Sequence, residues 1–204
     1  MADDITDPVL RERVERYLSS PVTHVLGNPD ARTCVIEFGD FECPYCAGAA
    51  PVLRELVASS DGQVRLIYRN FPLFEVHPHA LTAALAAESV AATAGEDAYW
   101  RMHEKLFVHQ ARLIDPDLRL YAESLGGAPE LATGAAAQRF APIVQADYAA
   151  GLEVGVAATP TLFIDGQPYE GRVEVGELRH ATGLNGSTPV PAEAPVRRRL
   201  FQRR

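Results

Sequence analysis

Two cysteines separated by two residues could carry redox chemistry, because residues 43–46 read Cys-Pro-Tyr-Cys. The preceding run 35–38, Val-Ile-Glu-Phe, is typical of a β-strand, and residues 47–58 are typical of a helix. The pattern therefore places Cys43 at the start of a helix and Cys46 one turn inside it. Backbone N–H groups and the positive end of the helix dipole favour an ionised thiol at that position. The two sulfurs are also close enough to form a disulfide.

Residue patterns elsewhere predict a β-α-β unit followed by a helical block. A short amphipathic helix is expected over 7–18, before a turn at 27–30. The β-α-β unit is expected to consist of a strand over 34–38, the helix that begins at the Cys-x-x-Cys, and a strand over 64–71. Four helices are then predicted, over 78–94, 97–107, 115–125 and 142–152. The last elements expected are a strand over 161–164, a turn at Asp165-Gly166, a strand over 169–173 and a helix over 175–182.

Composition limits the function classes. The chain has 204 residues, enough for one domain or one domain with an insertion, and its net charge of −8 argues against a nucleic-acid partner. No apolar run reaches the length of a membrane span. Three cysteines are too few for a disulfide-stapled secreted scaffold. The charged N-terminus lacks the apolar core of a signal peptide, so a cytoplasmic location is expected.

A zinc site is the first alternative use of the thiols. Cys43 and Cys46 could be half of a tetrahedral site that Cys34 and a histidine complete. The spacing of His77 and His79 is a poor fit to such a site, and Cys34 is expected to be a buried strand residue. No metal ligand is therefore predicted, while a zinc-binding or structural Cys-x-x-Cys domain stays the alternative.

A second motif, Thr159-Pro160 before the strand and turn of 161–166, gives the Cys-x-x-Cys a context. Together the two motifs resemble the thioredoxin superfamily, and within it the DsbA-like thiol–disulfide oxidoreductases. The interval 47–159 is nearly twice what a plain thioredoxin allows, and the helical block has the size of the DsbA-type insertion. The resemblance implies an α/β thioredoxin fold with a mostly helical insertion between the Cys-x-x-Cys helix and the cis-proline strand.

This resemblance divides the chain into five segments. They are an N-terminal extension at 1–21, the first half of the thioredoxin fold at 22–77, the helical insertion at 78–155, the second half of the fold at 156–184, and a flexible Pro-rich linker with a basic tail at 185–204.

The resemblance also implies roles for the active-site loop. Cys43 is expected to be a partly exposed thiolate that attacks a disulfide, and Cys46 is expected to resolve the mixed disulfide. Pro44 and Tyr45 would set how strongly the thiolate is stabilised.

Three residues outside this loop complete the implied site. Thr159 and a cis Pro160 are expected to lie against the sulfurs and bind an extended substrate segment. Glu37 stands where relatives carry a buried glutamate that exchanges a proton with the second cysteine. The lysine that pairs with this acid in some relatives is not evident, because Arg65 or Leu66 occupies the region where it is expected.

The sequence therefore predicts a protein disulfide oxidoreductase that exchanges disulfides with protein thiol or disulfide substrates. Its redox group would be the Cys43–Cys46 disulfide, with no other cofactor, and a redox recycling partner or a small thiol would regenerate it. A glutaredoxin-like reductase that depends on a low-molecular-weight thiol is the alternative on the same fold.

Overall fold

The computed structural model describes residues 5–18 and 24–184. The α-helices are α1 (Pro8–Leu18), α2 (Pro44–Ala58), α3 (Ala80–Ala94), α4 (Glu96–Val108), α5 (Asp115–Ser124), α6 (Gly134–Ala137), α7 (Ala141–Glu153) and α8 (Val175–Ala181). Two 3₁₀-helices are η1 (Pro129–Leu131) and η2 (Gln138–Phe140), and the strands are β1 (His24–Gly27), β2 (Thr33–Gly39), β3 (Val64–Asn70), β4 (Thr161–Ile164) and β5 (Gln167–Tyr169). The linker and basic tail predicted over 185–204, and parts of the predicted N-terminal extension, lie outside the described residues.

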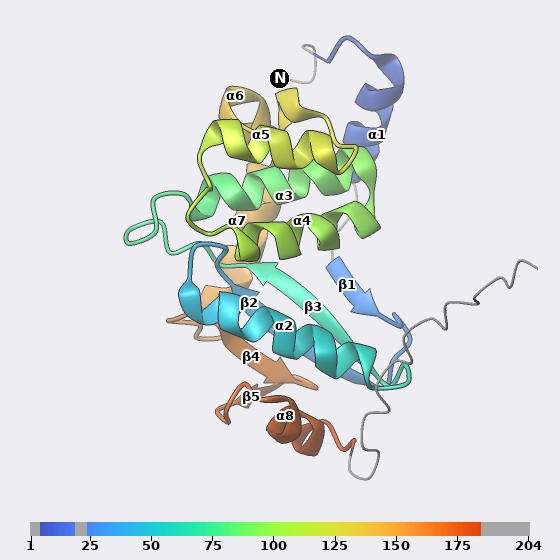
Figure 1. Ribbon diagram of the computed structural model, residues 1–204, viewed down its shortest axis with the longest axis vertical. Coiled ribbons are helices and arrows are strands. Elements are labelled where there is room, and N and C mark those ends of the chain that lie inside the picture. Colours follow the sequence, from blue (N-terminus) through green and yellow to red (C-terminus); the bar gives the residue numbers. More distant parts are fainter. Residues whose placement is uncertain (1–4, 19–23, 185–204) are drawn as a thin grey trace, which may run out of the picture.

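A five-stranded sheet forms the lower part of the fold, with strand order β1-β3-β2-β4-β5 (Figure 1). β2 pairs in parallel with β3 and antiparallel with β4, so β2 is the central strand. Helix α2 contacts the sheet and also α4 and α8, whereas α7 contacts β3. Phe38 of β2 packs against Phe71, Val156 and Phe163 in a separate apolar cluster that also touches Tyr148 of α7. The predicted mixed α/β fold is confirmed.

Two strand predictions need correction. The sequence did not predict β1, which is four residues long and pairs antiparallel with the edge of β3. The second strand of the hairpin was predicted two residues too late. Asp165 and Gly166 both have positive φ, as in a two-residue hairpin loop, and Ile164 therefore pairs with Gln167. This register makes β5 begin directly after the turn.

The helices between β3 and β4 pack around α3, which lies between α4 and α5 in Figure 1. Eight of its fifteen residues are alanines, and most of the helix is buried on all sides. Alanine favours helix and lets neighbouring helices approach closely. Glu88, near the middle of this mostly apolar helix, is an acidic residue whose side chain is fully buried.

Glu88 joins four elements through hydrogen bonds. Its carboxylate accepts from the Tyr17 hydroxyl of α1 at 2.6 Å and from the Asn70 amide of β3 at 2.7 Å. It also lies 3.2 Å from Nε2 of His24 in β1, whose Nδ1 is 2.9 Å from Glu96. Burial alone would lower the pKa of His24, but the two glutamates raise it to about 9. The buried pair is therefore ionic, and it fixes β1 and α1 against the helices.

We predict that Glu88→Ala lowers the free energy of unfolding by about 3 kcal/mol, because it leaves His24 and its other partners buried without their acceptor. The measurement is urea unfolding at pH 7, followed by circular dichroism. Glu123→Ala on the exposed side of α5 is the control, with an expected change within about 0.5 kcal/mol. Equal destabilisation by the two variants would contradict the structural role of Glu88.

Candidate active site

The strand β2 delivers the Cys-x-x-Cys to the start of α2. Cys43 is the N-cap residue of α2, and Pro44 occupies the first helical position, where its missing N–H costs little. Cys43 is only 3% exposed, whereas Tyr45 is 77% exposed. The expectation of a partly exposed Cys43 is therefore wrong. The reason is that residues far along the chain cover it: its Sγ lies 3.3 Å from the carbonyl oxygen of Thr159.

The two sulfurs have opposite electrostatic environments. The pKa of Cys43 is lowered to about 5, although burial opposes the shift. The largest cause is a hydrogen bond from the Cys46 thiol, and the Thr159 side chain and the backbone N–H groups of Cys46 and Tyr45 add further hydrogen bonds. The same bond to Cys43, together with burial and the charge of Glu37, raises the pKa of Cys46 far above its usual range. Near neutral pH, Cys43 is a thiolate and Cys46 is a thiol that donates to it.

The loop that faces the sulfurs has a cis peptide bond between Thr159 and Pro160, as expected. It leads into β4, and the antiparallel pairing of β4 with β2 brings Thr159 beside Cys43. The Thr159 carbonyl accepts from the protonated Cys43 thiol. The buried Thr159 hydroxyl has no partner other than the Cys43 sulfur, so it is free to donate to the thiolate.

Glu37 lies in the middle of β2, and its side chain is fully buried, as expected. An edge position that reaches solvent is excluded, because Tyr68 of β3 and Leu162 of β4 flank it. Neither carboxyl oxygen has a hydrogen-bond partner. Burial raises the pKa of Glu37 to about 8, and the charge of Cys43 adds to the effect. The residue opposite Glu37 on β3 is Tyr68, not Arg65 or Leu66.

Asp40 is a buried site residue that the sequence analysis missed. Its carboxylate accepts from the backbone N–H of Glu42 at 2.7 Å and of Leu73 at 2.8 Å, and it lies 2.8 Å from Nδ1 of His77. Its own N–H donates to the Cys46 sulfur at 3.5 Å. The local bond to Glu42 is a recognisable turn signal, but the bonds to the loop after β3 have none.

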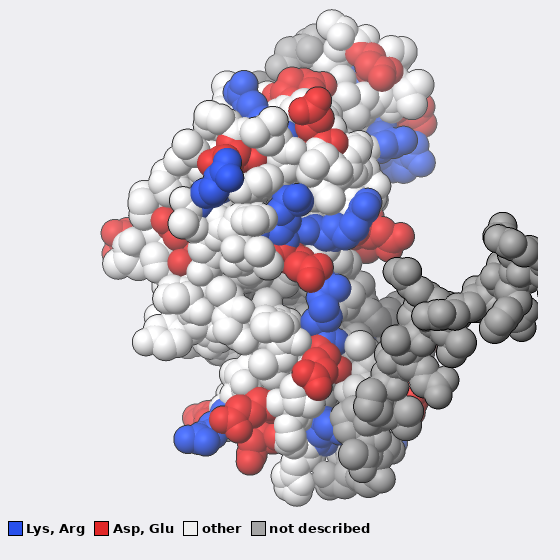
Figure 2. Space-filling view, in the orientation of Figure 1, with Lys and Arg blue, Asp and Glu red and all other residues white. Residues whose placement is uncertain are grey.

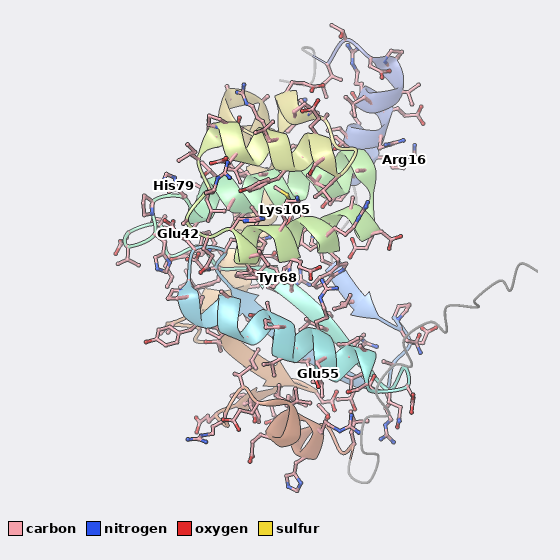
Figure 3. The ribbon with its side chains drawn as sticks, viewed as in Figure 1. Arg16, Glu42, Glu55, Tyr68, His79 and Lys105 are labelled. Atoms are coloured by element: carbon pink, nitrogen blue, oxygen red, sulfur yellow. The ribbon has the colours of Figure 1, made fainter. Side chains whose placement is uncertain are left out.

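Two further contacts fix the turn between β2 and α2. The Glu42 carboxylate accepts from the His79 N–H at 2.6 Å, and Figure 3 shows these two residues near each other. Gln110, from the loop after α4, donates to the carbonyl oxygens of Phe41 at 2.9 Å and Cys43 at 2.8 Å. The helical segment therefore helps to hold the active-site turn, through a residue that no local pattern marks.

The structure separates the residues of the zinc alternative. Cys34 is half-buried and lies at the opposite end of β2 from the turn, about 16 Å from Gly39 at 3.3 Å per residue. His77 is bonded to Asp40. Within residues 5–18 and 24–184, no group of three or more His, Cys, Asp or Glu side chains is arranged to hold a metal ion.

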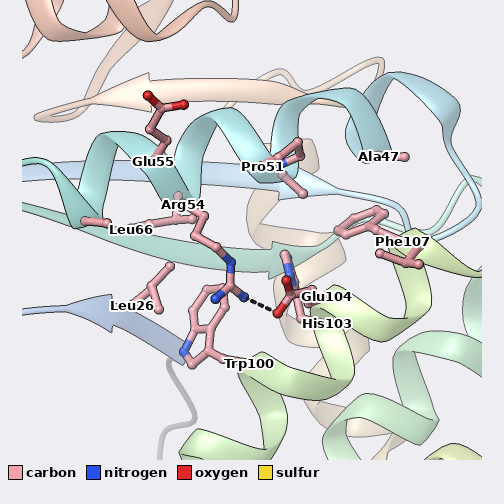
Figure 4. A pocket seen from close by; sticks show the side chains of 13 residues that line it. Leu26, Ala47, Pro51, Arg54, Glu55, Leu66, Trp100, His103, Glu104 and Phe107 are labelled. Carbon is pink, nitrogen blue, oxygen red and sulfur yellow. Dashed lines mark ion pairs between the residues drawn. The ribbon is translucent and has the colours of Figure 1, made fainter. Parts of the chain in front are cut away.

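An apolar groove of about 460 Å³ begins at Ala47 and runs between α2 and α4 (Figure 4). Trp100 and Phe107 line it from α4, and Arg54 pairs with Glu104 across it at 3.1 Å. The face in Figure 2 carries acidic and basic side chains interspersed, with no broad basic field.

Sequence relatives match most of this chain but little of their own length. The Na⁺/H⁺ antiporter NhaA 1 of Salinispora arenicola is 38% identical over 159 residues, which cover 78% of this chain and 24% of the antiporter. The chain thus spans about a quarter of the curated relatives it matches first. In the described part of the chain, no helix combines the length and apolar character needed to cross a membrane.

Solved structures match most of this chain over nearly all of their own length. BdbD from Bacillus subtilis, in its oxidised form, has a TM-score of 0.68 and 25% identity, with coverage of 79% of this chain and 91% of BdbD. A thioredoxin-like oxidoreductase from Silicibacter pomeroyi has a TM-score of 0.67 and 28% identity, covering 83% and 95%. The thiol-disulfide exchange protein alpha-DsbA2 from Wolbachia pipientis has a TM-score of 0.70 at 19% identity, covering 86% and 95%, which shows the fold.

The family described as Thioredoxin matches residues 19–182, which include both the Cys-x-x-Cys and the cis-proline loop. The chain therefore belongs to the thioredoxin family and has the fold of the DsbA-like thiol–disulfide oxidoreductases.

Proposed function

We propose that this protein exchanges disulfides with protein substrates through Cys43 and Cys46. The observation that carries the proposal is the position of the two sulfurs at the start of α2, which gives them opposite electrostatic environments. One is a stabilised thiolate at the start of α2, and the other is a buried thiol in hydrogen-bond contact with it. This arrangement supplies a nucleophile and a second thiol that can resolve the mixed disulfide.

In the reducing direction, the Cys43 thiolate attacks a substrate disulfide, and the first substrate sulfur leaves as a thiolate. Cys46 then transfers its proton to Glu37, which acts as general base in its ionised form. The Cys46 thiolate attacks Cys43, the bond between Cys43 and the substrate breaks, and the second substrate thiolate leaves. The substrate disulfide gains two electrons, and the enzyme gains the Cys43–Cys46 disulfide. Oxidation of a substrate dithiol reverses these steps.

Exposed apolar side chains near the thiolate support a protein substrate. Phe74 and Val76 are 54% and 68% exposed, and they lie in a loop that is bonded to Asp40 at Leu73 and His77. Tyr45 is exposed within the Cys-x-x-Cys itself. These side chains and the Thr159 backbone would hold an extended segment of the substrate as in strand addition.

The antiporter activity named for these relatives is not assigned to this chain, because the chain spans only about a quarter of their length.

The direction of electron flow depends on the compartment and the recycling partner. The cytoplasmic location stays a prediction, as does recycling by a protein partner or a small thiol. A coupled assay with glutathione, compared with one using thioredoxin reductase, distinguishes the two recycling routes.

We predict that Cys43→Ser abolishes reduction of insulin disulfides, because the attacking thiolate is lost. Cys46→Ser should instead accumulate mixed disulfides with substrate, visible on non-reducing gels and by mass spectrometry. Cys34→Ser is the matched control and should keep wild-type activity, since Cys34 lies at the far end of β2. Equal activity of the Cys43 and Cys46 variants would contradict the assignment of Cys43 as the attacking cysteine and Cys46 as the resolving cysteine.

The lowered pKa of Cys43 predicts a reactive thiolate in mildly acid solution. Alkylation of the reduced protein by iodoacetamide should rise with pH around a midpoint near 5, with modification mapped to Cys43 by mass spectrometry. Cys46→Ala should move this midpoint upward, because it removes the largest stabilising hydrogen bond. A wild-type midpoint near the ordinary cysteine value of about 8.5 contradicts the electrostatic argument.

A stabilised thiolate stabilises the reduced protein, and it therefore makes the disulfide more oxidising. We predict that the Cys43–Cys46 pair has a reduction potential less negative than the value of about −270 mV for thioredoxin. The measurement is equilibration with glutathione buffers. A value at or below that of thioredoxin would refute this prediction.

A further inference from the structure

Three buried oxygens without a hydrogen-bond partner in the protein lie behind the cysteines. They are the two carboxyl oxygens of Glu37 and the hydroxyl of Tyr68. Both side chains are 0% exposed. Buried polar groups in proteins are nearly always paired, directly or through a water molecule, so three unpaired oxygens on two paired residues call for an explanation.

The backbone places the two residues side by side. Glu37 and Tyr68 are direct partners in the parallel pairing of β2 with β3, so their side chains leave the same face of the sheet. The Tyr68 ring contacts Phe41 and, from α4, His103, with ring centres 5.2 and 4.6 Å apart (Figure 3 shows Tyr68).

Gly39 makes room for the far end of the Tyr68 ring. A Cβ atom at position 39 would lie 2.8 Å from the Tyr68 hydroxyl oxygen and 2.5 Å from a ring carbon. The hydroxyl therefore reaches the end of β2, where the chain turns toward the cysteines.

We propose that the Tyr68 hydroxyl and the Glu37 carboxyl share one water molecule, and that Tyr68 thereby positions Glu37 to take the proton of Cys46. The proposal rests on the function proposed above and adds a positioning residue to it. A buried water typically makes two to four hydrogen bonds, and the three unpaired oxygens supply that number.

The Tyr68 hydroxyl should speed the step in which Cys46 resolves the mixed disulfide. Hydrogen bonds to an ionised carboxylate favour the charged form. Glu37 has a pKa of about 8, so near neutral pH it is mostly protonated and accepts a proton only in its minor, ionised form. Tyr68 increases the population of that form. Its loss should therefore slow the transfer of the Cys46 proton to Glu37, and with it the attack of Cys46 on Cys43.

Other titratable groups also lie near Glu37 and Tyr68. Cys43 and Cys46 face Glu37 from α2. Tyr99 of α4 and Asp40 also interact electrostatically with Tyr68. His103 touches the Tyr68 ring, and burial lowers its pKa to about 3, so it stays neutral in the range tested.

The test uses a chromogenic aromatic disulfide, which releases one coloured thiolate when Cys43 attacks and a second when Cys46 resolves the mixed disulfide. In the wild type, the second phase should accelerate with pH around a midpoint no higher than about 8, because Cys43 carries no charge in the mixed disulfide and no longer raises the pKa of Glu37. In Tyr68→Phe, this midpoint should rise and the second phase at pH 7 should slow about tenfold, the equivalent of one pKa unit, with the first phase unchanged. The Phe ring preserves the aromatic contacts.

Tyr99→Phe is the matched control, because Tyr99 is also buried with an unpartnered hydroxyl. It should leave both phases unchanged. In a Glu37→Gln background, Tyr68→Phe should have no further effect on the pH dependence, because Tyr68 acts through Glu37. An equal effect of Tyr68→Phe with and without Glu37 would overturn the proposal.

Infrared titration of the Glu37 carboxyl in the reduced protein gives a readout that needs no exchange activity. The band assigned by its loss in Glu37→Gln should titrate at higher pH in Tyr68→Phe than in the wild type. An unchanged midpoint overturns the link between Tyr68 and Glu37. A shifted midpoint in a protein that exchanges no disulfide supports this link and refutes the proposed function.

Discussion

The carboxylate of Asp40 lies buried between the end of β2 and the loop after β3, and it accepts hydrogen bonds from both sides. The same residue donates its N–H to the Cys46 sulfur and accepts the Cys43 N–H at its carbonyl. A buried carboxylate must be satisfied by several donors, so the turn has little freedom to move. The positions of both sulfurs depend on this constraint, because α2 begins where the turn ends.

From this fixed turn the chemistry of the sulfurs follows. The start of α2 supplies N–H donors to Cys43, and Cys46 adds one more donor from inside the helix. Glu37 and Tyr68 lie behind the two cysteines in the sheet, and neither side chain is exposed to bulk solvent. Burial works against charge at every one of these groups, and only Cys43 has enough donors to overcome it. The Cys43 sulfur is therefore charged at the mouth of the helix, and Cys46, Glu37 and Tyr68 behind it are protonated.

The helices between β3 and β4 support the site from outside the sheet. Gln110 holds two carbonyl oxygens of the turn, and the Glu88 network ties β1 and β3 to the centre of the helical segment.

The sequence by itself determined the features that depend on neighbouring residues. The Cys-x-x-Cys at a strand-to-helix junction and the two-residue turn at Asp165-Gly166 follow from local propensities. The cis Thr159–Pro160 bond does not, because X–Pro bonds are mostly trans, and it was expected only from the resemblance to the thioredoxin superfamily. The burial of Glu37 was also predictable, from the apolar residues on both sides of it.

Only the tertiary structure decided what surrounds these residues. The pairing of Tyr68 with Glu37 depends on the register of two strands joined by a helix, and one residue of slip would have turned a different side chain to the carboxyl. The same holds for Gln110 and for the bonds of Asp40 to Leu73 and His77, which come from loops with no local pattern. Local spacing specifies where a thiol lies on a helix, whereas its exposure and its proton partners depend on packing between segments distant in sequence.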